Sequence, residues 1–119
     1  MKEGEKILRT KEPEDDLWFE DLQKLFRDKR KEGHEIIIAG DFNNNLNDKD
    51  EKVNTFMRQK LRMNEAMIDR YGKGPPTHVN GSTTIDGIFT TAGLHAIQGG
   101  YVSHRDSPSD HSWIWVDFK

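Results

Sequence analysis

The chain reads Ile36-Ile37-Ile38-Ala39-Gly40-Asp41-Phe42-Asn43, and this stretch decides its fold. An uncharged run of this kind predicts a buried strand that is covered on both faces. In layered α/β proteins, ligands bind beyond the carboxyl ends of such strands, so we expect Asp41 and Asn43 to lie in a functional site. Gly40 suits this position, because a residue without Cβ lets the backbone turn sharply or another group approach closely.

The composition limits both the size and the class of the protein. A chain of 119 residues is long enough for one domain with a hydrophobic core, but not for two. Three Trp and six Phe indicate a folded chain, although hydrophobic and charged residues each make up only 33%. The net charge of −3 lacks the basic excess of many nucleic-acid binders, so contact with a polyanion would be local or carried by metal ions. The absence of Cys excludes disulfides and thiolate zinc sites.

The N-terminal residues differ in character from the rest. Residues 1–12 are rich in Lys and Glu and predict a flexible, charged lead-in, whereas residues 13–119 are predicted to form a single domain. The only apolar pair in the lead-in is Ile7-Leu8. We therefore expect neither a signal peptide nor a membrane span, and we expect an intracellular protein with no membrane partner.

Hydrophobic periodicity predicts a domain of the α/β (α+β) class. A first helix is expected to begin near Pro13 and to end at Gly33. Its predicted apolar stripe consists of Trp18, Leu22, Leu25 and Phe26. A second helix is expected over 51–61, with Val53, Phe56, Met57 and Leu61 facing inward. Strands are expected over 35–40, 85–91, 95–104 and 112–118. Trp113 and Trp115 share one face of the last strand and are expected to be core or interface residues.

Four groups of polar residues lie at strand ends or in the adjoining loops. They are Asp41 with Asn43, Thr77-His78-Val79-Asn80, Asp86, and Ser109-Asp110-His111. An aspartate inside the apolar run 85–89 is costly unless it is paired, and His111 is the best available partner for Asp86. Such a pair fixes the tautomer of the imidazole and leaves its other nitrogen for a substrate. Asp41 and Asp110 remain as hard oxygen ligands, the type that Mg²⁺ or Mn²⁺ prefers.

Each group also has a structural interpretation. Asp41 and Asn43 could form an Asx turn at the end of a strand. The pair Asp110-His111 could be a surface turn, and Asp86 could bind a backbone amide. His78 could be an exposed loop residue. The functional interpretation depends on the groups occurring together.

Three motifs in a fixed order carry a family resemblance. They are Ile37-Ile38-Ala39-Gly40-Asp41-Phe42-Asn43, Thr84-Ile85-Asp86-Gly87-Ile88-Phe89 and Ser109-Asp110-His111-Ser112. Together they resemble the C-terminal half of the endonuclease/exonuclease/phosphatase superfamily, which includes DNase I-like nucleases, exonuclease III-like endonucleases, retrotransposon endonucleases and inositol phosphatases. The resemblance covers about residues 16–118. It implies half of a four-layer α/β/β/α sandwich, with one mostly antiparallel sheet and helices on one face.

The resemblance also implies roles for these residues. Asp41 would orient or activate the attacking water and contact the metal, while Asn43 would hold the scissile phosphate or that water. His111, paired with Asp86, would contact the phosphoryl oxygen in the transition state. Asp110 would bind or position Mg²⁺ or Mn²⁺. The residues predicted to bind substrate are His78, Asn80 and Ser109.

The chain departs from the family pattern in two respects. The first half of the family domain supplies a metal-binding Glu, and this chain shows no counterpart to that half. Gly87 stands where the family often has an aromatic residue. One half alone would leave an apolar sheet face uncovered, so we expect a homodimer or a complementing N-terminal half as partner.

Three functions follow from these observations. The leading hypothesis is a phosphodiester hydrolase that depends on Mg²⁺ or Mn²⁺. It would be an endonuclease in which water attacks the phosphate in line, and its substrate would be nucleic acid, DNA rather than RNA. One alternative is a non-catalytic half-domain that acts in binding or assembly. The other is a phosphatase that acts on a small phosphorylated lipid or metabolite.

Overall fold

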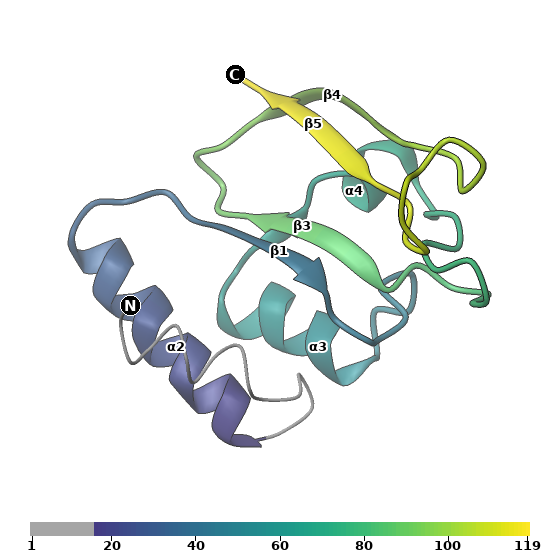
Figure 1. The fold of residues 1–119 in the computed structure, drawn as a ribbon. Helices are drawn as coiled ribbons and strands as arrows, with labels where there is room; N and C mark the ends of the chain where they lie inside the picture. The colour runs from purple at the N-terminus through teal and green to yellow at the C-terminus, as the bar shows by residue number, and fades with distance from the viewer. Residues whose placement is uncertain (1–15) are drawn as a thin grey trace.

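The computed structural model describes residues 16–119, which form a mixed α+β domain with two small antiparallel sheets (Figure 1). The predicted lead-in at 1–12 and the predicted helix start at Pro13 lie outside these residues. Within the described part of the chain, no helix is long and apolar enough to span a bilayer.

Helix α2, Asp16–Lys31, confirms the body of the first predicted helix. Its buried residues are Trp18, Phe19 and Leu22. The predicted stripe was therefore partly wrong, because Leu25 is exposed and Phe19 takes an inward position. The reason lies in the neighbouring helix, since the Phe19 ring packs against Phe56 with 4.6 Å between ring centroids. Tertiary packing thus shifts the buried face of α2.

The second predicted helix is present in two parts. Helix α3, Lys52–Thr55, continues into the π-helical turn η1, Phe56–Lys60. Val53, Met57 and Leu61 are buried as predicted, and Phe56 packs partly buried against the same cluster. These side chains form the core together with residues of α2 and the sheet.

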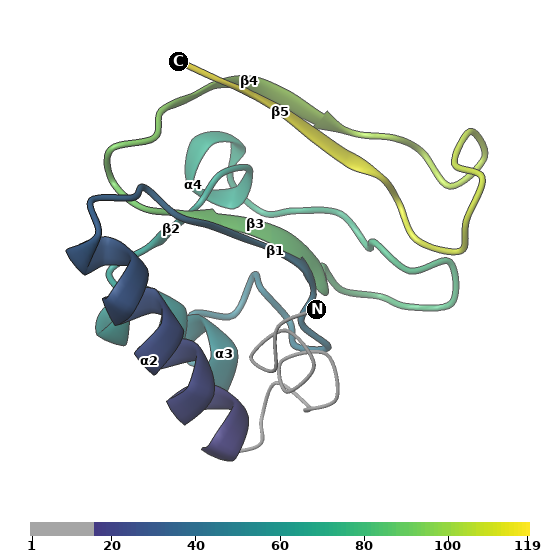
Figure 2. The same ribbon diagram turned by 60° about the vertical axis from the view of Figure 1, so that its left-hand side comes forward.

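The first sheet has the order β1-β3-β2 and consists of β1, Ile37–Asp41, β3, Asp86–Thr90, and β2, Asn64–Glu65. Helices α2 and α3 cover one face of this sheet (Figures 1 and 2). The prediction that β1 is covered on both faces was wrong, because Ile37 is 50% exposed. Strand β1 lies at an edge of the sheet, and only its other face packs on the helices.

The second sheet pairs β4, Ala96–Tyr101, with β5, Ile114–Phe118. All four predicted strands are therefore present, but they form two sheets rather than the one that was expected. Strand β3 already has β1 on one edge and β2 on the other, so β4 finds no free edge there. Helix α4, Ile68–Tyr71, lies between β3 and the β4–β5 pair (Figure 2). The expectation of helices on one face holds for α2 and α3 but not for α4.

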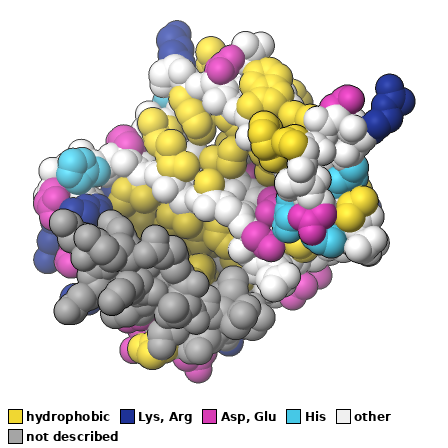
Figure 3. Space-filling model, in the orientation of Figure 1, with side chains coloured by type: hydrophobic (Ala, Val, Ile, Leu, Met, Phe, Trp, Pro, Cys, Tyr) yellow, Lys and Arg dark blue, Asp and Glu magenta, His cyan; other side chains and the backbone are white. Residues whose placement is uncertain are grey.

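A broad apolar surface is visible on the side of the molecule that carries β4 and β5 (Figure 3). Trp113 and Trp115 are 55% and 48% exposed, so neither of them is a core residue. The prediction of a core position was wrong for this pair, and the alternative of an interface stays a prediction.

Candidate active site

Two aspartates face each other where β1 ends and β3 begins. The antiparallel register places Asp41 directly opposite Asp86, and Gly40 opposite Gly87. Like charges in directly opposite positions on neighbouring strands destabilise a sheet. This end of the sheet therefore favours a positive or proton-donating partner.

His111 is that partner, and it contacts both carboxylates. Its Nδ1 lies 2.8 Å from Oδ2 of Asp86, and its Nε2 lies 3.9 Å from Oδ2 of Asp41. The predicted pairing of Asp86 with His111 is therefore confirmed. Nδ1–H donates to the carboxylate, so the tautomer is fixed and Nε2 faces Asp41. The hydrogen bond with Asp86 is the main cause that raises the pKa of His111 above its ordinary value, with smaller contributions from the charges of Asp86, Asp41 and Asp110.

Asp41 also shapes the turn that follows β1. Its Oδ1 accepts a hydrogen bond from the backbone N–H of Asn43 at 2.9 Å, which is an Asx turn. Asn43 has a φ of +53° and is exposed. The structural interpretation of this pair is therefore correct, and it is compatible with a functional one, because Oδ2 of Asp41 faces His111.

Gly40 precedes this turn with a φ of +147°, a backbone conformation that other residues rarely adopt. A Cβ added to Gly40 would meet no atom within 4 Å. The sequence offered two reasons for a glycine here, a sharp backbone turn and the close approach of another group. The structure supports the first reason and not the second.

A short backbone bridge brings His78 beside His111. The N–H of Val79 donates to the carbonyl of Asp110 at 2.8 Å, and the N–H of Ser112 donates to the carbonyl of Thr77 at 2.7 Å. The two imidazole rings lie edge to face, with 4.8 Å between their centroids. The bridge therefore joins a loop before β3 to the turn before β5.

Thr77 anchors this loop to the sheet. It is fully buried, and its Oγ1 accepts hydrogen bonds from the backbone N–H groups of Ile85 and Asp86 at 2.9 and 3.1 Å. Thr77 was named in one of the four polar groups of the sequence, but no role was predicted for it. Its neighbours Pro75 and Pro76 indicated only a loop, and nothing local in the sequence shows that the hydroxyl reaches β3.

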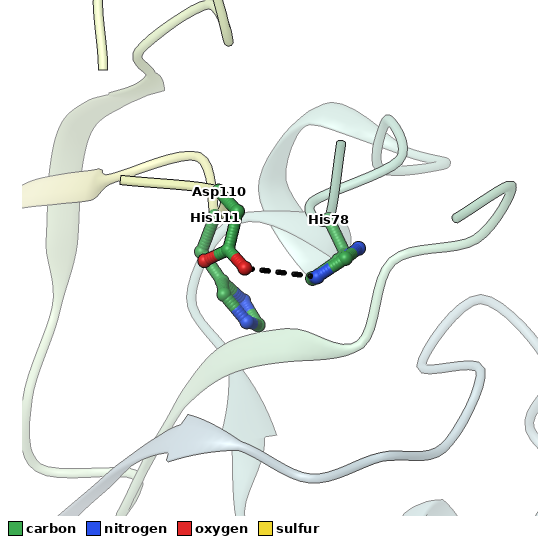
Figure 4. Close-up of side chains that lie close together, drawn as sticks. All are labelled: His78, Asp110 and His111. Atoms are coloured by element: carbon green, nitrogen blue, oxygen red, sulfur yellow. Dashed lines mark ion pairs between the residues drawn. The ribbon is translucent and has the colours of Figure 1, made fainter. Parts of the chain in front are cut away.

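Asp110 and His78 point toward each other (Figure 4). Nε2 of His78 lies 3.3 Å from Oδ2 of Asp110. The Asp110 side chain is 64% exposed, whereas that of His78 is mostly covered. His78 is therefore a member of the cluster rather than an isolated loop residue.

The other two residues predicted to bind substrate contact the histidines through hydrogen bonds that involve the backbone. The N–H of Asn80 donates to Nδ1 of His78 at 3.1 Å. Oγ of Ser109 accepts the N–H of His111 at 2.9 Å. Both residues are exposed, so substrate contact by their side chains stays a prediction.

Gly87 lies against buried side chains that leave no room for a side chain of its own. A Cβ at this position would lie 2.5 Å from Cδ1 of Leu46 and 3.1 Å from Oε2 of Glu65. Both of these side chains are fully buried and fill the space that an aromatic ring would need. The absence of a side chain at Gly87 is thus a consequence of local core packing.

The donor chemistry of the cluster fits a hard divalent cation. Among the described residues, two groups of ligand atoms lie within 4.8 Å of one another, namely Asp41, Asp86 and His111, and His78, Asp110 and His111. Asp86 is bound to His111, which leaves Asp41 and Asp110 as the exposed carboxylates of the two groups. Carboxylate oxygens of this kind suit Mg²⁺ or Mn²⁺ better than softer metals.

The chain matches no model of a known protein family, and it gives no match among curated proteins or solved structures. Its function is therefore argued from the residues and geometry of this cluster.

Proposed function

We propose that the chain is a divalent-metal-dependent phosphodiester hydrolase that acts on nucleic acid, and that it corresponds to the second half of a four-layer α/β/β/α sandwich. One observation carries the proposal. An imidazole with a fixed tautomer lies between two carboxylates on opposed strands, at 2.8 Å from one and 3.9 Å from the other. An exposed carboxylate beside it, Asp110, completes the donor set.

Asp41 and His111 would have different roles in hydrolysis. Oδ2 of Asp41 would orient the attacking water in line with the scissile phosphate. His111 would face the phosphoryl oxygens through Nε2, because Nδ1 is engaged by Asp86. The raised pKa of His111 favours an N–H donor at that position, which stabilises negative charge developing in the transition state.

Asp41 and Asp110 would hold Mg²⁺ or Mn²⁺. Such an ion, when bound, supplies neutralisation of the phosphoryl charge and lowers the pKa of a water molecule. Asn43 lies in the turn next to Asp41, where its amide would contact the phosphate.

The openness of the site favours a polymeric substrate over a small metabolite. The side chains of Asp41 and Asp110 are 43% and 64% exposed. Sites for small molecules are usually concave and enclose most of the ligand surface. A phosphodiester of a long nucleic acid needs only a surface that can lie against its backbone, so DNA fits these residues better than an inositol phosphate does.

A substrate panel tests the proposed function. Purified protein would be incubated with supercoiled plasmid, an abasic-site duplex, RNA and inositol phosphates, each with Mg²⁺, with Mn²⁺ or with EDTA. We expect metal-dependent nicking of DNA and its loss in the folded Asp41→Asn variant. Release of phosphate from inositol phosphates alone would support the phosphatase alternative. A folded parent chain without hydrolysis of any substrate would contradict the proposal and support a binding or assembly role.

We further propose that two copies of the chain pack through the apolar surface on the side of β4 and β5 (Figure 3), the strands that contain or adjoin Ile97, Trp113 and Trp115. Each of these side chains is about half exposed, which is unusual for so many large apolar residues on one small domain. Light scattering at micromolar concentration would detect a dimer, and Trp113→Ser would weaken it. A clean monomer would contradict the homodimer and leave a complementing N-terminal half as the proposed partner.

A further inference from the structure

The tautomer of His78 follows from the hydrogen bond at its Nδ1. Nδ1 accepts the backbone N–H of Asn80 at 3.1 Å, so this nitrogen carries a lone pair and no proton. The proton of the ring is then on Nε2, which lies 3.3 Å from Oδ2 of Asp110. The protonated nitrogen of His78 therefore faces the Asp110 carboxylate.

In the neighbouring histidine, Nδ1 is a donor rather than an acceptor. Nδ1 of His111 donates to Asp86, and its Nε2 faces Asp41. The backbone bridge between the two histidines holds both rings in register, with 4.8 Å between their centroids. One ring thus offers an N–H to Asp110, while the other is fixed by a carboxylate.

A nitrogen that carries a proton cannot bind a metal ion. We propose that His78 is a positioning residue that orients the Asp110 carboxylate toward a divalent cation and is not itself a ligand. This inference rests on the proposed function, because it assumes that Asp110 binds the cation. The contact of Nε2 with Oδ2 leaves Oδ1 of Asp110 for the ion. Because the Asp110 side chain is largely exposed, it needs such a partner to hold one orientation. Removal of an outer partner of a metal-binding side chain typically changes metal affinity by about 10-fold to 100-fold.

The affinity for Mn²⁺ tests this role without any measurement of activity. Free Mn²⁺ would be followed by electron paramagnetic resonance during titration of the full chain. We expect His78→Ala to weaken Mn²⁺ binding by about 10-fold, the lower end of the range for lost outer partners. His78→Gln should restore most of the affinity, because the Gln amide keeps an N–H donor near the position of Nε2.

A matched control is His34→Ala. His34 is an exposed histidine that pairs with Glu32 at 3.6 Å, before the start of β1, and its removal should leave Mn²⁺ binding unchanged. Circular dichroism of each variant would verify the fold. The backbone bridge does not involve the His78 side chain, so truncation should preserve it.

Nitrogen chemical shifts provide an independent test of the tautomers. We expect ¹⁵N–¹H spectra to show that His78 is protonated on Nε2 and not on Nδ1, and that His111 is protonated on Nδ1. A proton on Nδ1 of His78 would overturn the inference, as would equal Mn²⁺ affinity in parent and His78→Ala. Equally weak binding by the Gln and Ala variants would identify His78 as a ligand and would also overturn it. A parent chain that binds no Mn²⁺ would contradict the proposed function itself.

Discussion

Nδ1 of His111 lies 2.8 Å from Oδ2 of Asp86, and this contact ties the turn before β5 to the first residue of β3. The contact joins the two sheets, which share no strand. It also places the imidazole beside Asp41, the residue opposite Asp86 in the register. The same pair therefore contributes both to the architecture and to the chemistry of the proposed site.

Asp86→Asn should lower the pKa of His111 toward its ordinary value. The hydrogen bond and charge of Asp86 raise this pKa, and Asn keeps the shape of the side chain without the charge. A raised pKa in the folded state means that protonation of His111 stabilises the fold. This stabilisation is complete below the ordinary pKa of about 6.5 for His and is lost as pH rises through the higher folded-state value.

Nuclear magnetic resonance titration of the His111 ring measures its pKa. Urea unfolding across the same pH range measures how stability depends on the protonation of His111. Asp117→Asn is a suitable control, because Asp117 is an exposed residue of β5 that contacts Gln98. An unchanged pKa of His111 in Asp86→Asn would contradict the assignment of its cause.

Thr77→Val should destabilise the domain by about 1–3 kcal/mol, the usual cost of buried groups left without a partner. Val has nearly the same shape, but it cannot accept the N–H groups of Ile85 and Asp86. Urea unfolding would measure the change in the free energy of unfolding.

Thr55→Val is the control for this substitution. The Thr55 hydroxyl donates to the carbonyl of Lys49 at 3.3 Å in an exposed position, where water can replace the bond. The control should therefore lose less stability than Thr77→Val. Equal stability of the Thr77 variant and the parent would show that the loop is not anchored through this hydroxyl.

Glu65→Gln should also destabilise the fold by about 1–3 kcal/mol. Glu65 is fully buried, and burial raises its pKa although three backbone N–H groups donate to its carboxylate. Two of them, from Met67 and Ile68, reach Oε1, and the third, from Ile88, reaches Oε2. The Gln amide nitrogen cannot accept the bond from Ile88, so one donor would lose its partner.

Thermal unfolding at neutral pH would measure this effect, with Glu20→Gln on the exposed side of α2 as the control. No difference between the two variants would mean that the bond from Ile88 to Glu65 contributes nothing to stability.

The sequence predicted the parts of the site that follow from an apolar run or from the free-energy cost of burying an unpaired charge. The apolar run before Asp41 and the aspartate within 85–89 indicated strand ends, and the cost of an unpaired buried charge indicated the contact of Asp86 with His111. Strands β1 and β3 are long enough to show a hydrophobic pattern, and both are present.

Features that depend on short elements or on distant partners could not be predicted in this way. Strand β2 has two residues and helix α4 has four, too few for a periodic signal. The short β2 occupies the second edge of β3, and this is why the strands separate into two sheets. The contact of His78 with Asp110 depends on the backbone bridge between His78 and His111. Strands β3 and β4 lie between these two residues in the sequence, so no local pattern predicts the contact.

The central claim is that His111, held by Asp86 beside Asp41, belongs to a phosphodiester-cleaving site. The most direct measurement is the rate of Mn²⁺- or Mg²⁺-dependent plasmid nicking by the purified parent chain and by His111→Ala, prepared in parallel and shown to be folded. The account predicts measurable nicking by the parent and a loss of at least about 100-fold in the variant, in line with removal of a group that stabilises transition-state charge. Equal nicking by both proteins would contradict it.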